Sequence, residues 1–197
     1  MIQNIIFDMG NVLLEYNPQV SLDLFCRTEQ EKDVIRRELF LGPEWVQGDL
    51  GNMTCAQKYE SARARVPEHM HSPLEQCTFG WSFCIRPVPG AFSFLEYVKE
   101  KGFSVYLLSN ASDEFYDYFP GFFPLASFDG VVISSDVHMV KPDAGIYRYL
   151  LDVCRLKPEE CLFIDDMEEN VKGAKRMGMQ GEVFLNDFEN IKIRYGL

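Results

Sequence analysis

The sequence predicts an α/β fold, with a Rossmann-like parallel sheet covered by helices on both faces and an inserted helical cap. Two observations favour this fold. Five short runs rich in β-branched and aromatic residues recur along the chain, and helical patterns follow several of them. The stretch 17–85, by contrast, has apolar residues at helical spacing and no convincing strand. We therefore expect residues 1–16 and 86–197 to form the α/β core and residues 17–85 to form the cap.

The core elements are bounded by ordinary start and stop signals. Apolar runs predict strands at Ile2–Phe7, Phe103–Leu108, Val131–Ile133, Cys161–Ile164 and Glu182–Leu185. Glycine and proline delimit the helices between them, because glycine ends helices readily and proline cannot continue one. One helix is expected from Pro89-Gly90 to Gly102, one after Lys141-Pro142, and one over Glu168–Met177.

The expected cap contains start and stop signals for helices as well. Gly42-Pro43 breaks a helical pattern, and Thr54 is a candidate N-cap for a helix that runs to Val66. Pro67 would then end that helix. The cap is therefore expected to consist of several short helices rather than one long one.

Composition excludes several classes of function. The chain has 197 residues and a formal net charge of −11, and an acidic surface does not suit a nucleic-acid backbone. No apolar stretch approaches the roughly 18 to 20 residues of a membrane span. The start of the chain lacks the basic region of a signal peptide, and the six cysteines form no CxxC pair. We expect a cytoplasmic protein with reduced thiols, a monomer or homodimer, whose partner is a small molecule rather than nucleic acid or membrane.

Polar side chains follow three of the predicted strands, at the edge where an open α/β sheet binds ligands. The fourth polar position, Lys141, lies in "VKPD" after the strand at Val131–Ile133. Each has an ordinary structural explanation as well: a hairpin turn, a helix cap or a solvated surface lysine. The residues that follow the strands are Asp8, then Ser109 with Asn110, then Asp165 with Asp166.

Taken together, these residues indicate phosphoryl chemistry. Three carboxylates at one edge repel each other unless a cation lies among them, and hard oxygen ligands suit Mg²⁺. A magnesium ion, a lysine and a hydroxyl form a pocket in which a phosphoryl group is held and its charge stabilised. The sequence thus predicts a Mg²⁺-dependent enzyme that acts on a small phosphorylated substrate.

The motifs "FDMGNVLL", "LLSN", "VKPD" and "FIDDMEEN" occur in that order along the chain. In this ordered set the sequence resembles the haloacid dehalogenase-like (HAD) hydrolase superfamily, in particular its sugar-phosphate phosphatases with a small helical cap. The resemblance implies that Asp8 is a nucleophile that forms an aspartyl-phosphate. It also implies that Ser109 and Asn110 hydrogen-bond the phosphoryl oxygens, and that Lys141 neutralises charge there.

The resemblance further implies a metal site. Asp8, Asp166 and the backbone carbonyl of Gly10 would hold Mg²⁺, while Asp165 and Asn170 would orient its water ligands and the lysine. The position of Gly10 departs from the family pattern, because most phosphatases of the family have an aspartate there as general acid. An anomeric phosphate leaves easily, so a hexose 1-phosphate is one substrate consistent with this loss.

Two alternatives remain open at this point. Metal-free 2-haloacid dehalogenases of the family also lack the second aspartate, and Arg27, Arg36 and Arg37 are available to receive halide. However, those enzymes lack the acidic pair that this chain keeps, which favours the phosphatase. The other alternative is a catalytically impaired phosphate-binding protein.

Substrate specificity is expected to come from the cap, which would close over the leaving group. The candidate contacts near the start of the cap and within it are Glu15, Tyr16 and Trp45. Trp45 is equally consistent with a place in the core of the cap. If a general acid is required, Asp165 or Glu15 is a candidate to act through water.

Overall fold

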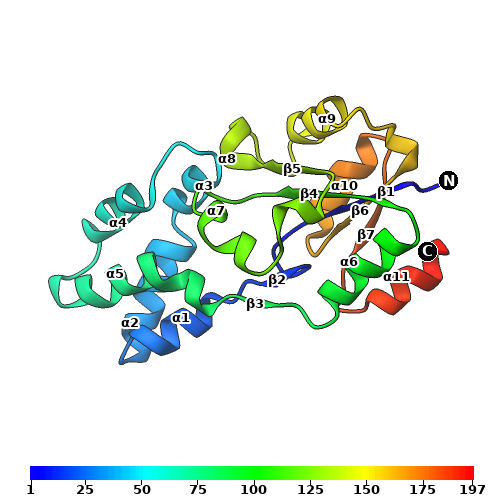
Figure 1. The fold of residues 1–197 in the computed structure, drawn as a ribbon. Helices are drawn as coiled ribbons and strands as arrows, with labels where there is room; N and C mark the ends of the chain where they lie inside the picture. Colours follow the sequence, from blue (N-terminus) through cyan, green and yellow to red (C-terminus); the bar gives the residue numbers. More distant parts are fainter.

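A five-stranded parallel sheet forms the centre of the protein in the computed structural model, which describes residues 1–197. The strands have the order β5-β4-β1-β6-β7, so β1 lies in the middle with β4 and β6 as its neighbours (Figure 1). Their bounds are β1 Asn4–Phe7, β4 Ser104–Ser109, β5 Gly130–Ile133, β6 Cys161–Asp165 and β7 Gln180–Val183. The predicted fold class is confirmed, and a strand overlaps each of the five predicted runs.

The last strand, β7, begins and ends two residues earlier than predicted. It spans Gln180–Val183 rather than residues 182–185, and Leu185 is exposed. The reason is a close approach of backbone to helix α10 (Glu168–Arg176) at Gly181, where an added Cβ would lie 2.9 Å from Val171 Cγ1. Glycine carries little strand signal of its own, so the pattern of apolar residues placed the strand too late.

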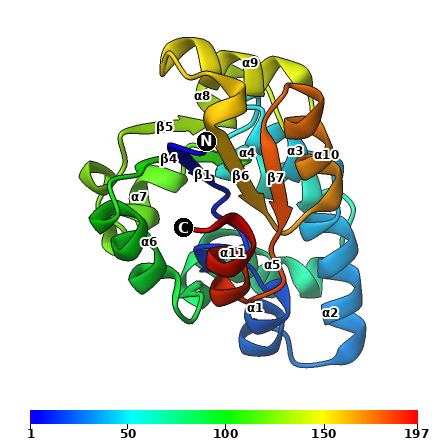
Figure 2. The same ribbon diagram turned by 90° about the vertical axis from the view of Figure 1, so that its right-hand side faces the viewer.

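Helices cover both faces of the sheet. Alternate side chains of β1 point to opposite faces, because the side-chain period of a strand is two. Ile5 and Phe7 pack with α6 (Ala91–Glu100) and α11 (Phe188–Tyr195), whereas Ile6 packs with α9 (Ala144–Val153) and α10. Figure 2 shows these two helix pairs on opposite sides of the sheet. The helices predicted after Gly90, after Pro142 and from Glu168 are these α6, α9 and α10.

Short helices make up the stretch between β1 and α6, as the sequence predicts. In addition to a π-helix at Arg36–Phe40, they are α1 Pro18–Phe25, α2 Glu29–Ile35, α3 Pro43–Asp49, α4 Cys55–Arg63 and α5 His71–Gly80. Thr54 caps α4 in a reciprocal capping box with Gln57, as predicted, although the helix ends at Arg63 rather than Val66.

The entry to this helical segment and the exit from it lie side by side. β2 (Leu14–Glu15) pairs antiparallel with β3 (Arg86–Pro87), and in Figure 1 the helices from α1 to α5 lie to the left of this pair. β2 does not pair with β1, so the Gly10-Asn11 turn forms no hairpin with the first strand. No helix in the structure is long and apolar enough to cross a membrane.

One hydrophobic cluster extends through both the helical segment and the sheet. It joins Leu22, Ile35 and Leu74 of the helices to Ile5 and Phe7 of β1. A division into core and cap at residues 17–85 stays a prediction, and the shared cluster indicates that the two parts stabilise each other.

We expect Leu74→Ala to destabilise the whole protein rather than the helical segment alone. Leu74 is fully buried in the shared cluster, and truncation of a buried leucine costs about 2–5 kcal/mol of unfolding free energy. Urea unfolding followed by circular dichroism should show one transition at lower denaturant. Leu24→Ala, at a side chain that is 64% exposed, is the matched control and should change little. A separate early transition of the helices would contradict the expectation.

Candidate active site

A buried lysine between two carboxylates lies at the carboxyl edge of the sheet. The Lys141 Nζ lies 2.7 Å from Asp8 Oδ1 and 2.7 Å from Asp165 Oδ2. Asp8 follows β1 and Asp165 ends β6, the neighbouring strand, so their side chains meet because parallel strands end at the same edge. All three side chains are at least 90% buried. The attraction of the two carboxylates outweighs the cost of burial for the lysine and raises the Lys141 pKa.

Asp165 is fully committed to holding other groups in place. Its Oδ1 accepts hydrogen bonds from the Met167 backbone N–H at 2.8 Å and from Asn170 Nδ2 at 3.1 Å. Its Oδ2 accepts from Lys141 and again from Asn170, at 3.0 Å. With both oxygens occupied and no exposed surface, Asp165 orients Lys141 and the start of α10.

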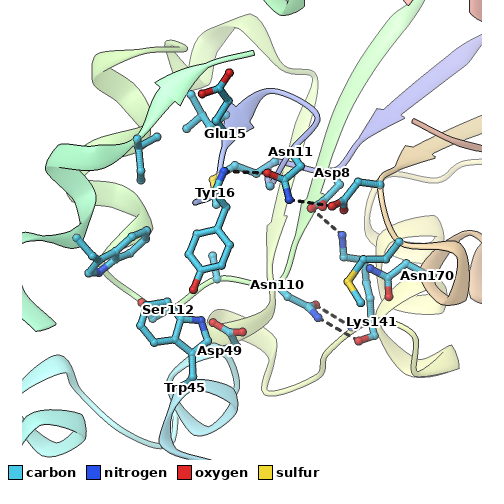
Figure 3. Close-up of a pocket in the computed structure, with 18 of the residues that line it drawn as sticks. Asp8, Asn11, Glu15, Tyr16, Trp45, Asp49, Asn110, Ser112, Lys141 and Asn170 are labelled. Atoms are coloured by element: carbon cyan, nitrogen blue, oxygen red, sulfur yellow. Dashed lines mark hydrogen bonds and ion pairs between the residues drawn. The ribbon is translucent and has the colours of Figure 1, made fainter. Parts of the chain in front are cut away.

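Hydrogen bonds from the end of β4 hold the loop that contains Lys141. Asn110, directly after β4, accepts a hydrogen bond from the Lys141 N–H at 2.8 Å and donates one to its carbonyl at 3.0 Å (Figure 3). The sequence led us to expect that this amide would bind phosphoryl oxygens. In the structure its side chain bonds the Lys141 backbone, so Asn110 positions the lysine, and it also lines the pocket. Its contact with phosphoryl oxygens stays a prediction.

Unlike the side chain of Asn110, the side chain of Ser109 makes no hydrogen bond within the protein. It is 1% exposed at the end of β4, and its Oγ has no hydrogen-bond partner. A buried hydroxyl without a partner is costly. The hydroxyl therefore has unused hydrogen-bonding capacity next to the Asn110 end of the pocket, although Ser109 itself does not form part of the pocket surface.

Asp166 is held by a residue that the sequence did not single out. Asn11 donates from Nδ2 to Asp166 Oδ2 at 2.9 Å and accepts at Oδ1 from the Tyr16 N–H at 2.9 Å (Figure 3). Its backbone is left-handed, with φ of 53°, which asparagine tolerates better than most residues. The sequence signal was Gly10-Asn11, but it indicated only a turn.

The oxygen atoms at this edge fit a hard divalent cation. Carboxylate oxygens of Asp8, Asp165 and Asp166 lie within 4.8 Å of one another. Asp165 is engaged elsewhere, whereas the Gly10 carbonyl accepts no hydrogen bond from the protein. The remaining donors are carboxylate and carbonyl oxygens, which are the ligands Mg²⁺ takes in proteins. Asp8, Asp166 and the Gly10 carbonyl are thus the residues that fit such an ion.

The electrostatics agree with this donor set. Burial raises the pKa of Asp8 to about 7, although Lys141 opposes the shift, and Asp165 and Asp166 raise it further. Partial burial also raises the pKa of Asp166, and its hydrogen bond from Asn11 opposes that shift. One lysine is not enough to balance three neighbouring carboxylates, so an added cation would favour their charged forms.

A pocket of about 240 Å³ opens next to Asp8, and four aromatic side chains are part of its lining. The rings of Trp45 and Trp81 pack 5.5 Å apart, and those of Trp81 and Tyr118 pack 5.3 Å apart. Tyr16 lies 5.9 Å from Trp45. Of the predicted substrate contacts, Glu15, Tyr16 and Trp45 all line this pocket, with Glu15 exposed (Figure 3).

Other groups in the pocket carried no usable signal in the sequence. Trp81 and Asp49 line it from the helical segment, and Tyr118 lines it from α7 (Phe115–Tyr118), eight residues after the motif "LLSN". Conversely, none of the arginines considered as halide ligands, Arg27, Arg36 and Arg37, lines the pocket. Arg36 pairs with Asp33 and Arg37 with Glu38.

Comparison with known proteins agrees with this architecture. A sesquiterpene phosphatase of Aspergillus oryzae is 29% identical over 179 residues, which are 89% of this chain and 86% of that protein. A mutant HAD family enzyme from Bacteroides thetaiotaomicron, solved in complex with magnesium and inorganic phosphate, matches with a TM-score of 0.76 at 20% identity, covering 97% and 99% of the two chains. A HAD-like family hydrolase from Porphyromonas gingivalis matches with a TM-score of 0.74 at 24% identity, covering 99% and 98%.

The two structures establish likeness of fold only, because their sequence identity to this chain is low. The family model provides the assignment by sequence, since it describes haloacid dehalogenase-like hydrolases and matches residues 2–178, nearly the whole chain. Together with the four motifs and the edge at which they meet, this match shows that the chain belongs to the haloacid dehalogenase-like hydrolase family.

Proposed function

We propose that this hydrolase is a Mg²⁺-dependent phosphatase that cleaves small phosphomonoesters through an aspartyl-phosphate on Asp8. The observation that carries the proposal is the buried Asp8–Lys141–Asp165 arrangement, with the free Asp8 Oδ2 bordering the pocket. Support also comes from the orphaned Ser109 hydroxyl and from the sesquiterpene phosphatase relative. The metal-free dehalogenase is disfavoured because the acidic cluster is present and the candidate arginines lie outside the pocket.

Each residue has a defined part in this reaction. Asp8 attacks phosphorus from its unpaired oxygen, and Lys141 keeps the neighbouring carboxylate charged and offsets charge on the phosphoryl group. Ser109 donates its free hydroxyl to a phosphoryl oxygen, while Asp165, Asn170 and Asn110 hold the lysine in place. The bound Mg²⁺ would supply charge stabilisation for the transferring group.

The pocket indicates the kind of leaving group. Its wall of Tyr16, Trp45, Trp81 and Tyr118 offers ring faces, which suit the apolar face of a sugar ring or a hydrocarbon chain. The hexose 1-phosphate expected from the sequence remains one candidate. The relative's name favours a second, a terpenoid monophosphate. Comparison of kcat/KM for a hexose 1-phosphate and a prenyl monophosphate would separate the two.

Asp8→Asn should reduce hydrolysis of p-nitrophenyl phosphate by more than about 10³-fold, because the amide is no nucleophile. Beryllofluoride with Mg²⁺, a mimic of the phosphoryl group on aspartate, should raise the Tm of the wild type but not of this variant. Asp152→Asn, an exposed carboxylate on α9, is the control for charge. A wild type without turnover that still responds to beryllofluoride would instead favour the phosphate-binding alternative.

Removal of divalent cations should abolish turnover. EDTA treatment followed by dialysis is expected to leave no measurable phosphate release, and added Mg²⁺ should restore it, because the one lysine at this edge does not balance the three carboxylates of Asp8, Asp165 and Asp166. Halide release from 2-chloropropionate is measured in parallel. Phosphate release that persists without metal, or halide release that does, would count against the proposal.

Lys141→Met should lower the free energy of unfolding by about 3 kcal/mol in metal-free buffer at pH 8, since it leaves two buried carboxylates without their partner. The folded-state pKa of Asp8 already lies above the unfolded value and should rise further, so the folded variant takes up protons as pH falls. The deficit should therefore shrink between pH 8 and pH 5, measured by urea unfolding. Lys172→Met, at an exposed surface lysine, should cost less than about 1 kcal/mol at either pH.

A further inference from the structure

One carboxylate reaches the pocket from the helical segment and has no partner there. Asp49 is the last residue of α3 and lines the same pocket as Asp8. It is partly buried, and its carboxylate makes no hydrogen bond or ion pair, so only burial and the more distant Lys58 and Lys141 influence it. Figure 3 shows it below Tyr16 and beside Trp45, across the pocket from Asn11.

The backbone around Asp49 is fixed to the core. The Ser134 hydroxyl donates to the Asp49 carbonyl at 2.6 Å. The Ser134 Oγ also accepts a hydrogen bond at 2.9 Å from the N–H of Ala111, the residue after Asn110. His138 Nδ1 lies 2.7 Å from the Leu50 carbonyl. At Gly51, with φ of 70°, an added Cβ would be 2.4 Å from the Ser135 carbonyl oxygen. The bonds to Ser134 and His138 therefore hold the Asp49 backbone at a set position relative to the loop after β4.

The surroundings of Asp49 favour a proton on its carboxyl group. Burial raises the pKa of Asp49 to about 6, against the opposing effects of Lys58 and Lys141. Lys58 is itself paired with Glu114 at 2.9 Å, and the other titratable groups facing Asp49 are the hydroxyls of Tyr16 and Tyr118. A carboxyl with a pKa near the working pH is suited to give and take protons.

The other carboxylates at the site are less suited to this task. Gly10 has no side chain, and both oxygens of Asp165 are engaged by Lys141, Asn170 and the Met167 N–H. Glu15 is exposed to solvent, whereas Asp49 is partly buried. Asp166 is held by Asn11 and belongs to the proposed metal site.

We propose that Asp49 is the general acid and base of the reaction, supplied by the helical segment in place of the side chain that Gly10 lacks. This proposal rests on the proposed phosphatase function. In the first step Asp8 Oδ bonds to phosphorus, the bond from phosphorus to the leaving oxygen breaks, and the Asp49 carboxyl proton moves to that oxygen. In the second step the Asp49 carboxylate takes a proton from water as water oxygen bonds to phosphorus and the phosphorus–Asp8 bond breaks. Phosphate is released and both aspartates return to their starting forms.

Asp49→Asn tests the proposal through the leaving group. An alkyl phosphate needs its leaving oxygen protonated, whereas p-nitrophenolate leaves without a proton. We expect kcat/KM of the variant to fall about 10²- to 10⁴-fold on ethyl phosphate, and by less than about 10-fold on p-nitrophenyl phosphate. The value of kcat/KM is used because it reports the first phosphoryl transfer. Asp152→Asn should lower neither value, and Asp49→Glu, which keeps a carboxyl, should retain more activity on ethyl phosphate than Asp49→Asn.

A second variant restores an acid from the other side of the pocket. A Cβ at Gly10 would lie 3.8 Å from Asp8 Oδ2, an ordinary contact, and Gly10 is not among the residues with positive φ. The double variant Gly10→Asp/Asp49→Asn should therefore fold and recover at least about 10-fold in kcat/KM on ethyl phosphate over Asp49→Asn. A matching Tm for the single variants establishes that each comparison is between folded proteins.

The outcomes distinguish this proposal from the function on which it rests. An equal loss on both substrates, or no loss on either, overturns the role of Asp49 while the phosphatase function stands. Absence of turnover by the wild type on every phosphomonoester, with Asp8→Asn no different, overturns both. Selective loss on ethyl phosphate together with rescue by Gly10→Asp supports the assignment.

Discussion

The active site depends on the ion pairs that the buried ammonium group of Lys141 forms with Asp8 and Asp165. The ammonium group lies 2.7 Å from carboxylates at the ends of two adjacent strands, and it alone offsets their repulsion within the protein. Asn110 holds its backbone from a third strand, and Asn170 holds Asp165 from helix α10. The sheet order, with β1 between β4 and β6, brings these groups together. The strand ends therefore bring the charged groups of the site together, and the surrounding residues hold Lys141 where its charge offsets those of the two carboxylates.

The helical segment contributes a different part of the chemistry. Its Trp45 and Trp81, with Tyr16 and Tyr118 of the core, form the aromatic wall that is proposed to contact the leaving group, and Asp49 is the carboxylate it adds. Gly10 keeps a free carbonyl but lacks a side chain, so the proposed mechanism assigns metal binding and proton transfer to different residues. The first can belong to the turn after β1, and the second is proposed to belong to a residue that the helices bring in. The hydrophobic cluster that the helices and the sheet share packs the helical segment against the sheet.

Much of the core was predictable because it follows from local patterns. Apolar runs located every strand of the sheet, and glycine and proline located the main helices. Asp8, Ser109 and the Asp165-Asp166 pair were predictable as a group, since residues that follow parallel strands must meet at one edge. The prediction was wrong where tertiary packing outweighed the local pattern: β7 begins earlier than predicted because Gly181 packs against α10. The bonds between Asn110 and the Lys141 backbone were not predicted, because they join residues 31 positions apart.

By itself, the sequence determined the fold class and the set of groups at the carboxyl edge, because both depend on the order of strands along the chain. The tertiary structure alone decided what surrounds them. Trp81 and Tyr118 pack against each other at the pocket although they lie 37 positions apart. Ser134 and His138 bond the carbonyls of Asp49 and Leu50 and so place the end of α3 beside the pocket. Those contacts join residues about 85 positions apart, and no local spacing or propensity encodes them. The catalytic edge is thus a property of strand order, whereas the pocket is a property of how the helices dock.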